Sequence, residues 1–355
     1  TSKKRLPTSF GIKDPERSEC HDGVSTQPSA EGEVSVTTIT IGVDLAKNLF
    51  SVCSVNATGR VLDRQEFRRE KFAAWLAQRP AGTAVAMEAC SGAHHWARVC
   101  VELGLQPLLM AAQFVKPFRK SAGSKNDRND AEAIATAARQ GNMRFVPLKS
   151  LDQQVRLSWH RVREGYKAEG LAIGNRIRGL LAEFGVVIAP SDAALRRGLA
   201  DLDAVSLPSE LIELIRDLAA HWEAVVKRVI TCDRRIEAHA RADERCVRVR
   251  SVIGIGALTA DALVATIGSG IEFKNGRQLA AWLGLVPRQH SSGGHARLGG
   301  ITCRGDAYLR TLLIQGARSS LQRAKAVSVE KATPEQRWIR SLTQHIQHRP
   351  FWNGC

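Results

Sequence analysis

The sequence predicts a mixed α/β domain, then a long helical region, then a mainly helical C-terminal domain. Short apolar segments bounded by turns follow one another between residues 37 and 111. Through the middle of the chain apolar residues recur at helical spacing, and glycine-flanked turns separate helices in the last third. We therefore expect a disordered extension (1–36), an α/β domain (37–147), a helical region (148–246), a C-terminal domain (247–330) and an atypical tail (331–355).

The first domain is predicted to hold a mixed sheet. In Thr37–Asp44, apolar residues alternate with small or polar ones, which is typical of a strand with one buried face. A turn at Asn56–Gly59 joins the next two strands. The expected further strands are Leu49–Val55, Val61–Phe67, Thr83–Glu88 and Pro107–Ala111, and the expected helices are Glu70–Gln78, His94–Leu103 and Asp127–Gln140.

The helical region contains a heptad seam. Its apolar positions step alternately by four and three residues: Leu211, Ile215, Leu218, Trp222, Val225, Val229, Cys232 and Ile236. This spacing is that of a coiled coil. Two readings stay open, one in which the helix packs on its own domain and one in which it pairs with a second copy.

The last third is predicted to carry a helix-hairpin-helix element. Gly254 and Gly256 lie in a turn before the amphipathic segment Leu258–Ile267, and such a turn can offer backbone N–H groups to a phosphate. The glycine-rich loop His290–Gly300 and a helix at Asp306–Arg318 follow.

Composition favours a nucleic-acid partner. The formal net charge is +16 and the pI is about 9.9, and a globular protein this basic usually meets a polyanion. Charge serving solubility alone is the alternative. No apolar stretch is long enough to span a bilayer and no signal peptide is evident, so we expect a cytoplasmic protein with no membrane partner. The eight cysteines form no CxxC pair, which argues against structural zinc.

Four carboxylates are the strongest candidates for chemistry. Asp44 and Glu88 end two predicted strands, whereas Asp127 and Asp130 are three residues apart at the start of a helix and face the same way. Carboxylates at strand tips and on one helical turn can converge on two divalent cations that promote phosphodiester cleavage. The alternative is that Asp127 and Asp130 only cap their helix.

Several segments together resemble the DEDD-type transposases of bacterial insertion sequences. The N-terminal segments are Ile41–Lys47, Met87–Cys90, His94–Trp96 and Lys125–Ala133, and the C-terminal segments are Gly254–Gly256, Ala281–Arg288, Ser292–Gly293 and Gly305–Arg310. The resemblance covers roughly residues 37 to 318. It implies an RNase H-like domain similar to the RuvC resolvase, followed by a second domain that supplies a serine nucleophile.

The resemblance also implies a mechanism. By position, Asp44, Glu88, Asp127 and Asp130 match the family's metal-binding acids, for two Mg²⁺ ions or Mn²⁺ in their place. Ser292 matches the nucleophile, with Ser291 as the adjacent alternative. The expected partners are the element ends and target DNA, a noncoding guide RNA, and further copies of the chain. The protein is expected to act at the nucleoid. The expected nucleic-acid contacts are Lys125, Arg128, Gly254, Gly256, Arg288, Arg297, Arg304 and Arg310.

Some features depart from the family pattern. Relatives usually carry Lys where Cys303 stands, and the stretch Leu342–Cys355 resembles a frameshifted or truncated tail. The first Met is Met87, so we expect the natural start at an alternative codon now read as Val34 or Val36. Two rival functions remain: a structure-selective, resolvase-type nuclease that needs the carboxylates but not Ser292, and an inactive nucleic-acid-binding remnant.

Overall fold

The computed structural model describes residues 39–119, 127–291, 297–328 and 330–347, with the backbone alone for 127, 128 and 343–347. A five-stranded sheet in the order β3-β2-β1-β4-β5 forms the N-terminal part. β1 pairs antiparallel with β2, and β2 antiparallel with β3, whereas β4 runs parallel to both β1 and β5. The strands are β1 (Thr40–Leu45), β2 (Leu49–Val55), β3 (Val61–Arg68), β4 (Ala84–Glu88) and β5 (Gln106–Met110). The predicted mixed sheet is confirmed and is consistent with an RNase H-like domain.

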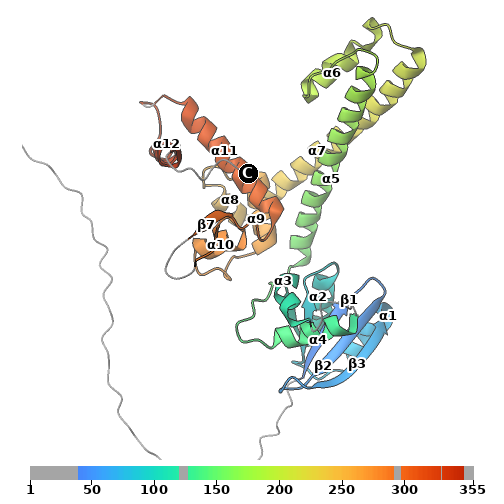
Figure 1. Cartoon of the computed structure of the whole chain (residues 1–355), viewed down its shortest axis with the longest axis vertical. Coiled ribbons are helices and arrows are strands. Elements are labelled where there is room, and N and C mark those ends of the chain that lie inside the picture. Colours follow the sequence, from blue (N-terminus) through green and yellow to red (C-terminus); the bar gives the residue numbers. More distant parts are fainter. Residues whose placement is uncertain (1–38, 120–126, 292–296, 329, 348–355) are drawn as a thin grey trace, which may run out of the picture.

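Helices cover both faces of the sheet (Figure 1). On one face, α1 (Arg69–Leu76) and α2 (Ala93–Glu102) enclose an aromatic core in which Phe50 meets Phe72 and Trp96 edge to face. On the other face lies α4 (Asp127–Ala138), predicted as Asp127–Gln140. The short α3 (Ala112–Val115) and the 3-10 turn η1 (Lys116–Phe118), which were not predicted, lead toward α4.

Gly42 sets the distance between α4 and the sheet. A Cβ atom at this position would lie 2.2 Å from the Ala131 carbonyl oxygen and 2.5 Å from the Ala135 nitrogen. Only glycine allows this approach, because any side chain would overlap the helix backbone. Residues 42 and 44 share one face of β1, so the side chain of Asp44 also faces the α4 side.

A helical arm rises from the α/β domain (Figure 1). α5 (Leu151–Ala182) leads away from it, α6 (Asp192–Ala200) lies at the far end, and α7 (Ser209–Ala242) returns antiparallel to α5. α5 begins with a capping box between Ser150 and Gln153. The predicted heptad seam of α7 is buried or half-buried, and its Leu211–Val225 part packs with Ile173, Ile177 and Leu181 of α5. The seam therefore packs within the chain itself.

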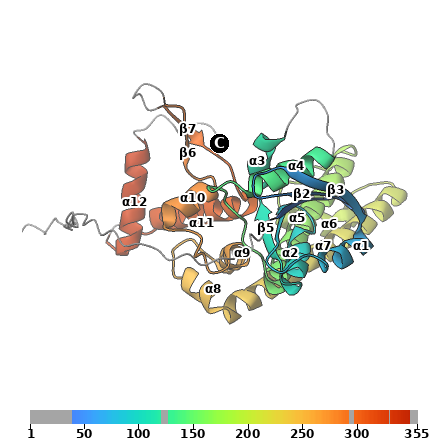
Figure 2. The same ribbon diagram turned by 90° about the horizontal axis from the view of Figure 1, so that it is seen from below.

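The C-terminal part is helical apart from one hairpin. Two small cores lie among α8 (Glu244–Val249), α9 (Ala257–Ile267), α10 (Gly276–Trp282) and α11 (Ala307–Ala326), and α12 (Pro334–Gln347) contacts α11. The expected glycine-rich loop at His290–Gly300 is partly strand, because β6 (Pro287–Gln289) pairs antiparallel with β7 (Leu298–Ile301). Figure 2 shows this hairpin projecting beyond α10 and α11. Among the helices of the described residues, none is long and apolar enough to cross a membrane.

Candidate active site

Two of the four predicted acids lie at one edge of the sheet. Val43 pairs with Met87 in the parallel β1–β4 ladder, so Asp44 and Glu88 follow at neighbouring strand ends. Ala86 packs in the core beneath α4, and Glu88 shares its face of β4. Both carboxylates therefore face the side of the sheet that α4 covers, and both residues are half-buried.

Asp130 joins this edge from the first turns of α4. Arg119, which directly follows η1, donates from Nη2 to Oε1 of Glu88 at 3.1 Å and lies 3.1 Å through Nε from Oδ1 of Asp130. The two carboxylates keep only 16% and 13% of their side-chain surface exposed, against 38% for Arg119. One guanidinium thus bridges acids from a strand and a helix. Sequence reasoning missed Arg119, because nothing in its local pattern distinguishes it from other surface arginines.

The pKa of the Cys90 thiol is sensitive to the charges of the neighbouring acids. Burial raises the pKa of its thiol, and the charges of Asp44 and Glu88 raise it further. The thiol thus lies within the field of both acids, which supports the closeness that the strand register indicates. A raised pKa keeps this thiol protonated and a poor nucleophile at neutral pH.

The three described carboxylates have the chemistry to bind a hard divalent cation, but their side chains are not arranged around a common point. Carboxylate oxygens are the ligands that Mg²⁺ prefers, and Asp44, Glu88 and Asp130 share one side of the sheet edge. Among the described side chains, however, no group of three acids, histidines or cysteines is arranged to hold a metal ion. The guanidinium of Arg119 supplies the positive charge between two of the acids. The side chain of Asp127, the fourth predicted acid, lies outside the description, as does that of Arg128.

The predicted nucleophile lies between β6 and β7 in the sequence. Ser292 falls outside the described residues, as does Lys125, so the position of its hydroxyl is not described. Its neighbour Ser291 accepts a hydrogen bond through Oγ from Nε2 of Gln289 at 2.9 Å. The stem is closed by the His290 N–H, which donates to the Arg297 carbonyl at 2.8 Å. Three predicted nucleic-acid contacts near this hairpin, Arg288, Arg297 and Arg304, are exposed.

Two other predicted nucleic-acid contacts have packing roles in the structure. Gly254 has a φ of +91°, and a Cβ there would lie 2.9 Å from the Gly316 carbonyl oxygen of α11. Arg310 donates through Nη1 to the carbonyls of Leu283 and Arg304, both at 3.0 Å. The turn and the guanidinium therefore hold the C-terminal helices together. Gly256, by contrast, is exposed, with open space where a side chain would stand.

A buried polar network ties the arm to the C-terminal helices, and the sequence analysis did not identify it. Asp261 of α9 is fully buried and accepts hydrogen bonds from Arg156 (2.6 and 2.8 Å), while its other oxygen lies 2.9 Å from Nε2 of His160. The opposite ring nitrogen of His160 lies 2.9 Å from the Tyr308 hydroxyl. Arg156 also donates to Asp243 at 2.7 Å. The available signal was Asp261 itself, an acid within the apolar segment Leu258–Ile267.

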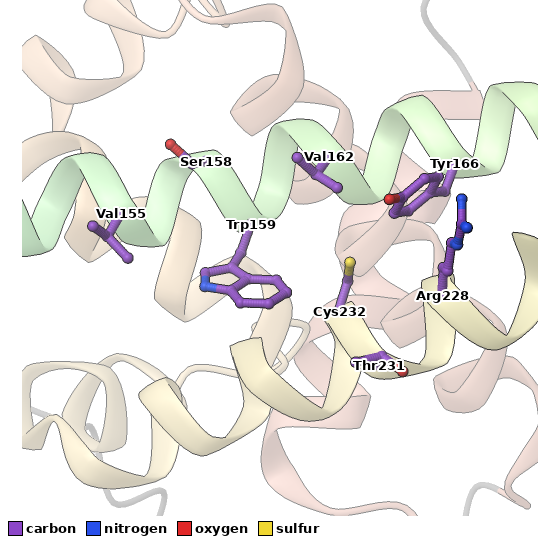
Figure 3. Close-up of a pocket in the computed structure, with 8 residues that line it drawn as sticks. All are labelled: Val155, Ser158, Trp159, Val162, Tyr166, Arg228, Thr231 and Cys232. Atoms are coloured by element: carbon purple, nitrogen blue, oxygen red, sulfur yellow. The ribbon is translucent and has the colours of Figure 1, made fainter.

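An apolar groove runs between the two arm helices (Figure 3). Its volume is about 460 Å³, with Val155, Trp159, Val162 and Tyr166 of α5 on one side. These four positions step by four, three and four residues, the spacing of a second heptad seam. Val155 and Val162 are 54% and 44% exposed, so α7 leaves these two positions uncovered. Trp159 and Tyr166, by contrast, are half-buried beneath Arg235 and Arg228 of α7.

Family models match both parts of the chain. A model described as the transposase IS116/IS110/IS902 family matches residues 246–332, and a DEDD transposase model of the IS110 type matches residues 41–185. The first match spans α9, the hairpin and α11, and the second spans the sheet, α4 and α5. Between them lie α6 and α7.

Similar proteins from several bacteria support the same assignment. A probable family 20 transposase of Pseudomonas aeruginosa is 43% identical over 314 residues, which cover 87% of this chain and 90% of the relative. The transposase for insertion sequence element IS1111A of Coxiella burnetii is 37% identical, covering 89% and 85%. The transposase for IS1328 of Yersinia enterocolitica is also 37% identical, covering 86% and 90%. The chain belongs to the IS116/IS110/IS902 family of insertion-sequence transposases.

Proposed function

We propose that this transposase cleaves and exchanges DNA strands with two divalent cations, Mg²⁺ or Mn²⁺, and a serine nucleophile. Asp44, Glu88, Asp127 and Asp130 would hold the cations, which stabilise the charge that develops on phosphate oxygens. The observation that carries this proposal is the clustering of Glu88 and Asp130 around one cationic group at the strand edge where Asp44 also ends. Buried acids need such a positive partner, and a divalent cation could replace the guanidinium.

The Ser292 hydroxyl is the proposed nucleophile. Its Oγ would form a bond to phosphorus as the bond from phosphorus to one bridging oxygen of the DNA breaks. The serine gives up its proton, and the leaving strand becomes a free hydroxyl. A hydroxyl of the partner strand then reverses the reaction and releases the serine. The exposed arginines around the hairpin stem support this proposal, because they offer positive charge to the phosphate.

We further propose that a noncoding RNA guides the reaction. The resemblance implies such an RNA, and the net charge of +16 suits a protein that binds two nucleic acids at once. Since the substrate would be chromosomal DNA, the reaction would take place at the nucleoid. Footprinting of the DNA and of the RNA would identify which nucleic acid each basic residue contacts.

Recombination of the element's DNA ends, in the presence of its flanking RNA and Mg²⁺, tests the mechanism. We expect recombination by the wild type and by Glu70→Ala, an exposed acid of the same domain, and none by Asp44→Ala or Ser292→Ala. Ser291→Ala distinguishes the two adjacent serines. If Ser292→Ala and Ser291→Ala still cleave while Asp44→Ala does not, the chain is a resolvase-type nuclease. If the wild type only binds, it is an inactive remnant.

Assembly of the chain into a homo-oligomer through the arm is part of the proposal, because transposition must hold two DNA partners together. The groove lined by the exposed Val155 and Val162 and the half-buried Trp159 and Tyr166 supports this, since its apolar surface could receive a helix of a second copy (Figure 3). Val155→Asp with Val162→Asp should convert the oligomer to monomer in light scattering. Leu62→Asp, an exposed apolar position on β3, is the matched control. An unchanged mass would remove the arm groove as the interface.

A further inference from the structure

Four basic side chains meet where the α/β domain joins the arm. His94 and Arg98 lie on α2, Lys149 precedes the Ser150 cap of α5, and Arg161 lies on α5. Nζ of Lys149 is 3.3 Å from Nε2 of His94, and the Lys149 N–H donates to Nδ1 of the same ring at 3.3 Å. Arg98 donates through Nη1 to the Lys149 carbonyl at 3.0 Å. The contacts hold this basic cluster in place around one residue, Lys149.

The basic cluster lacks neutralising acids. Within the described part of the chain, no carboxylate forms an ion pair with Arg98, Lys149 or Arg161. The acid whose charge does act on Lys149 is Asp306, and this residue caps α11 by accepting the Leu309 N–H at 3.0 Å. Like charges thus remain close together, which is unfavourable unless an anion joins them.

Protonation equilibria agree with this surplus of positive charge. Burial, together with the positive charges of Lys149, Arg98 and Arg161, lowers the pKa of His94 to about 4. Burial and Arg161 likewise lower the pKa of Lys149. The effects of Arg161 on both groups place its guanidinium within electrostatic reach of His94 and Lys149.

The basic cluster begins on α2 at the end of β4 that carries Glu88, although α2 and α4 cover opposite faces of the sheet. β4 ends at Glu88, and the next element is α2, whose first turn carries His94. The contact of 2.9 Å between His160, which precedes Arg161 on α5, and the Tyr308 hydroxyl places the first turn of α11, the helix following the hairpin, beside this part of α5. A DNA strand that presents one phosphate to the carboxylates would pass this end of the sheet and could present a further phosphate to the basic cluster.

We propose that Arg98, Lys149 and Arg161, with the uncharged His94 positioning Lys149, bind a backbone phosphate of the DNA substrate other than the one that is cleaved. The proposal rests on the proposed function for the identity of the ligand. A phosphodiester carries one negative charge and unprotonated oxygens, which accept hydrogen bonds from guanidinium and ammonium donors. Binding there would fix the position of the strand without reading its sequence.

The test is DNA affinity as a function of salt, measured with the full chain in EDTA. Fluorescence anisotropy with a 30-base-pair duplex would compare wild type, Arg161→Gln, Lys149→Gln and Arg176→Gln. Arg176 is the matched control, since it is also exposed on α5 and lies about 22 Å further along the helix. We expect the dissociation constant to rise about 3–10-fold for Arg161→Gln and Lys149→Gln, and the salt slope to fall by about 1 for each.

Several outcomes would overturn the proposal. One is an affinity of Arg161→Gln equal to that of Arg176→Gln, and another is a loss confined to a single-stranded RNA of equal length. Because Arg161 is exposed, its removal should leave the unfolding midpoint unchanged, and that measurement excludes a folding defect. EDTA removes divalent cations, so the assay measures binding without catalysis. If DNA binding depends on Arg161 but the protein does not recombine DNA, the proposed function is wrong and the phosphate-binding proposal stands.

Discussion

The Nε atom of Arg119 lies 3.1 Å from Oδ1 of Asp130, although Asp130 is one of the acids expected to hold a cation. A second donor of the same guanidinium reaches Glu88. A divalent cation entering this edge must displace Arg119, and the two positive charges compete for the same oxygens. The first prediction follows from this competition.

Arg119→Ala should bind Mn²⁺ about 2–10-fold more tightly than the wild type. Arg119 is partly exposed, so solvent screening keeps the effect within about 1 kcal/mol or slightly above. Isothermal titration calorimetry measures the affinity directly. Arg64→Ala is the control. Arg64 pairs with Glu132, which lies on α4 as Asp130 does, but among the described side chains it does not pair with the predicted metal-binding acids. Weaker binding in Arg119→Ala would show that the guanidinium positions the acids rather than competing with the ion.

Gly42→Ala should destabilise the α/β domain by at least about 2 kcal/mol. The added methyl group would meet the backbone of α4 at 2.2 Å, and a backbone cannot move aside as a flexible side chain can. Urea unfolding followed by circular dichroism gives the free energy. Gly141→Ala, where nothing lies within 4 Å of the new methyl, should leave it nearly unchanged. Equal stabilities would mean that α4 shifts freely on the sheet.

Asp261→Asn should cost about 3–5 kcal/mol, because it leaves the buried Arg156 charge without its closest partner. The substitution preserves shape, so the loss is electrostatic. Asp233→Asn breaks the pair with Arg163 at a side chain that is 45% exposed, and it should cost less than about 1 kcal/mol. Chemical denaturation of both variants tests the contrast, and comparable losses would contradict it.

Cys303→Gly should stabilise the protein by about 0.5–1 kcal/mol. Cys303 has a φ of +53°, the one non-glycine positive φ among the described residues, and side chains disfavour this conformation. Cys303→Ala keeps the strained backbone and should be close to neutral. A thermal melt under reducing conditions compares the three proteins. Stabilisation by alanine as well would trace the effect to the thiol instead of the backbone.

His94 should make the protein less stable as the pH falls from about 6.5 to 4. Its pKa is about 4 when folded, against 6.5 for an unperturbed histidine. Between these values the unfolded chain binds more protons, so stability is present at higher pH and is lost on acidification. Unfolding at pH 7.0 and 5.0 should show a smaller drop for His94→Gln than for the wild type. His95→Gln, at an exposed neighbouring position, should behave like the wild type.

Local patterns in the sequence predict the sheet well and the long-range contacts poorly. Alternation in Thr37–Asp44 identifies both the buried face of β1 and the face that carries Asp44, because side-chain direction in a strand depends only on parity. The bridge from Arg119 to Glu88 joins residues 31 positions apart, with a helix and a strand between them, so no local signal reveals it.

The same limit explains the turn at Gly254 and the seam of α7. A glycine-flanked turn is compatible with phosphate binding and with close packing, and only the position of Gly316 on α11 decides for packing at Gly254. The heptad spacing of α7 indicates a partner helix but not which one. That partner is α5, so the second copy is expected instead at the seam that α5 leaves exposed.

The length of the arm is independent of the spacing of the residues at its base. The chain leaves the α/β domain at Leu151, and α7 ends at Ala242 beside the C-terminal helices. α9 packs against the bases of both α5 and α7 through Arg156, Asp261 and Ala240. Each arm helix extends roughly 50 Å at 1.5 Å per residue, yet its length does not enter the spacing of the groups at its base. Deleting matched heptads from the two helices therefore shortens the reach of the protein and leaves its base unaltered. The arm can therefore be shortened, lengthened or fused to another domain at its tip without moving the residues at its base.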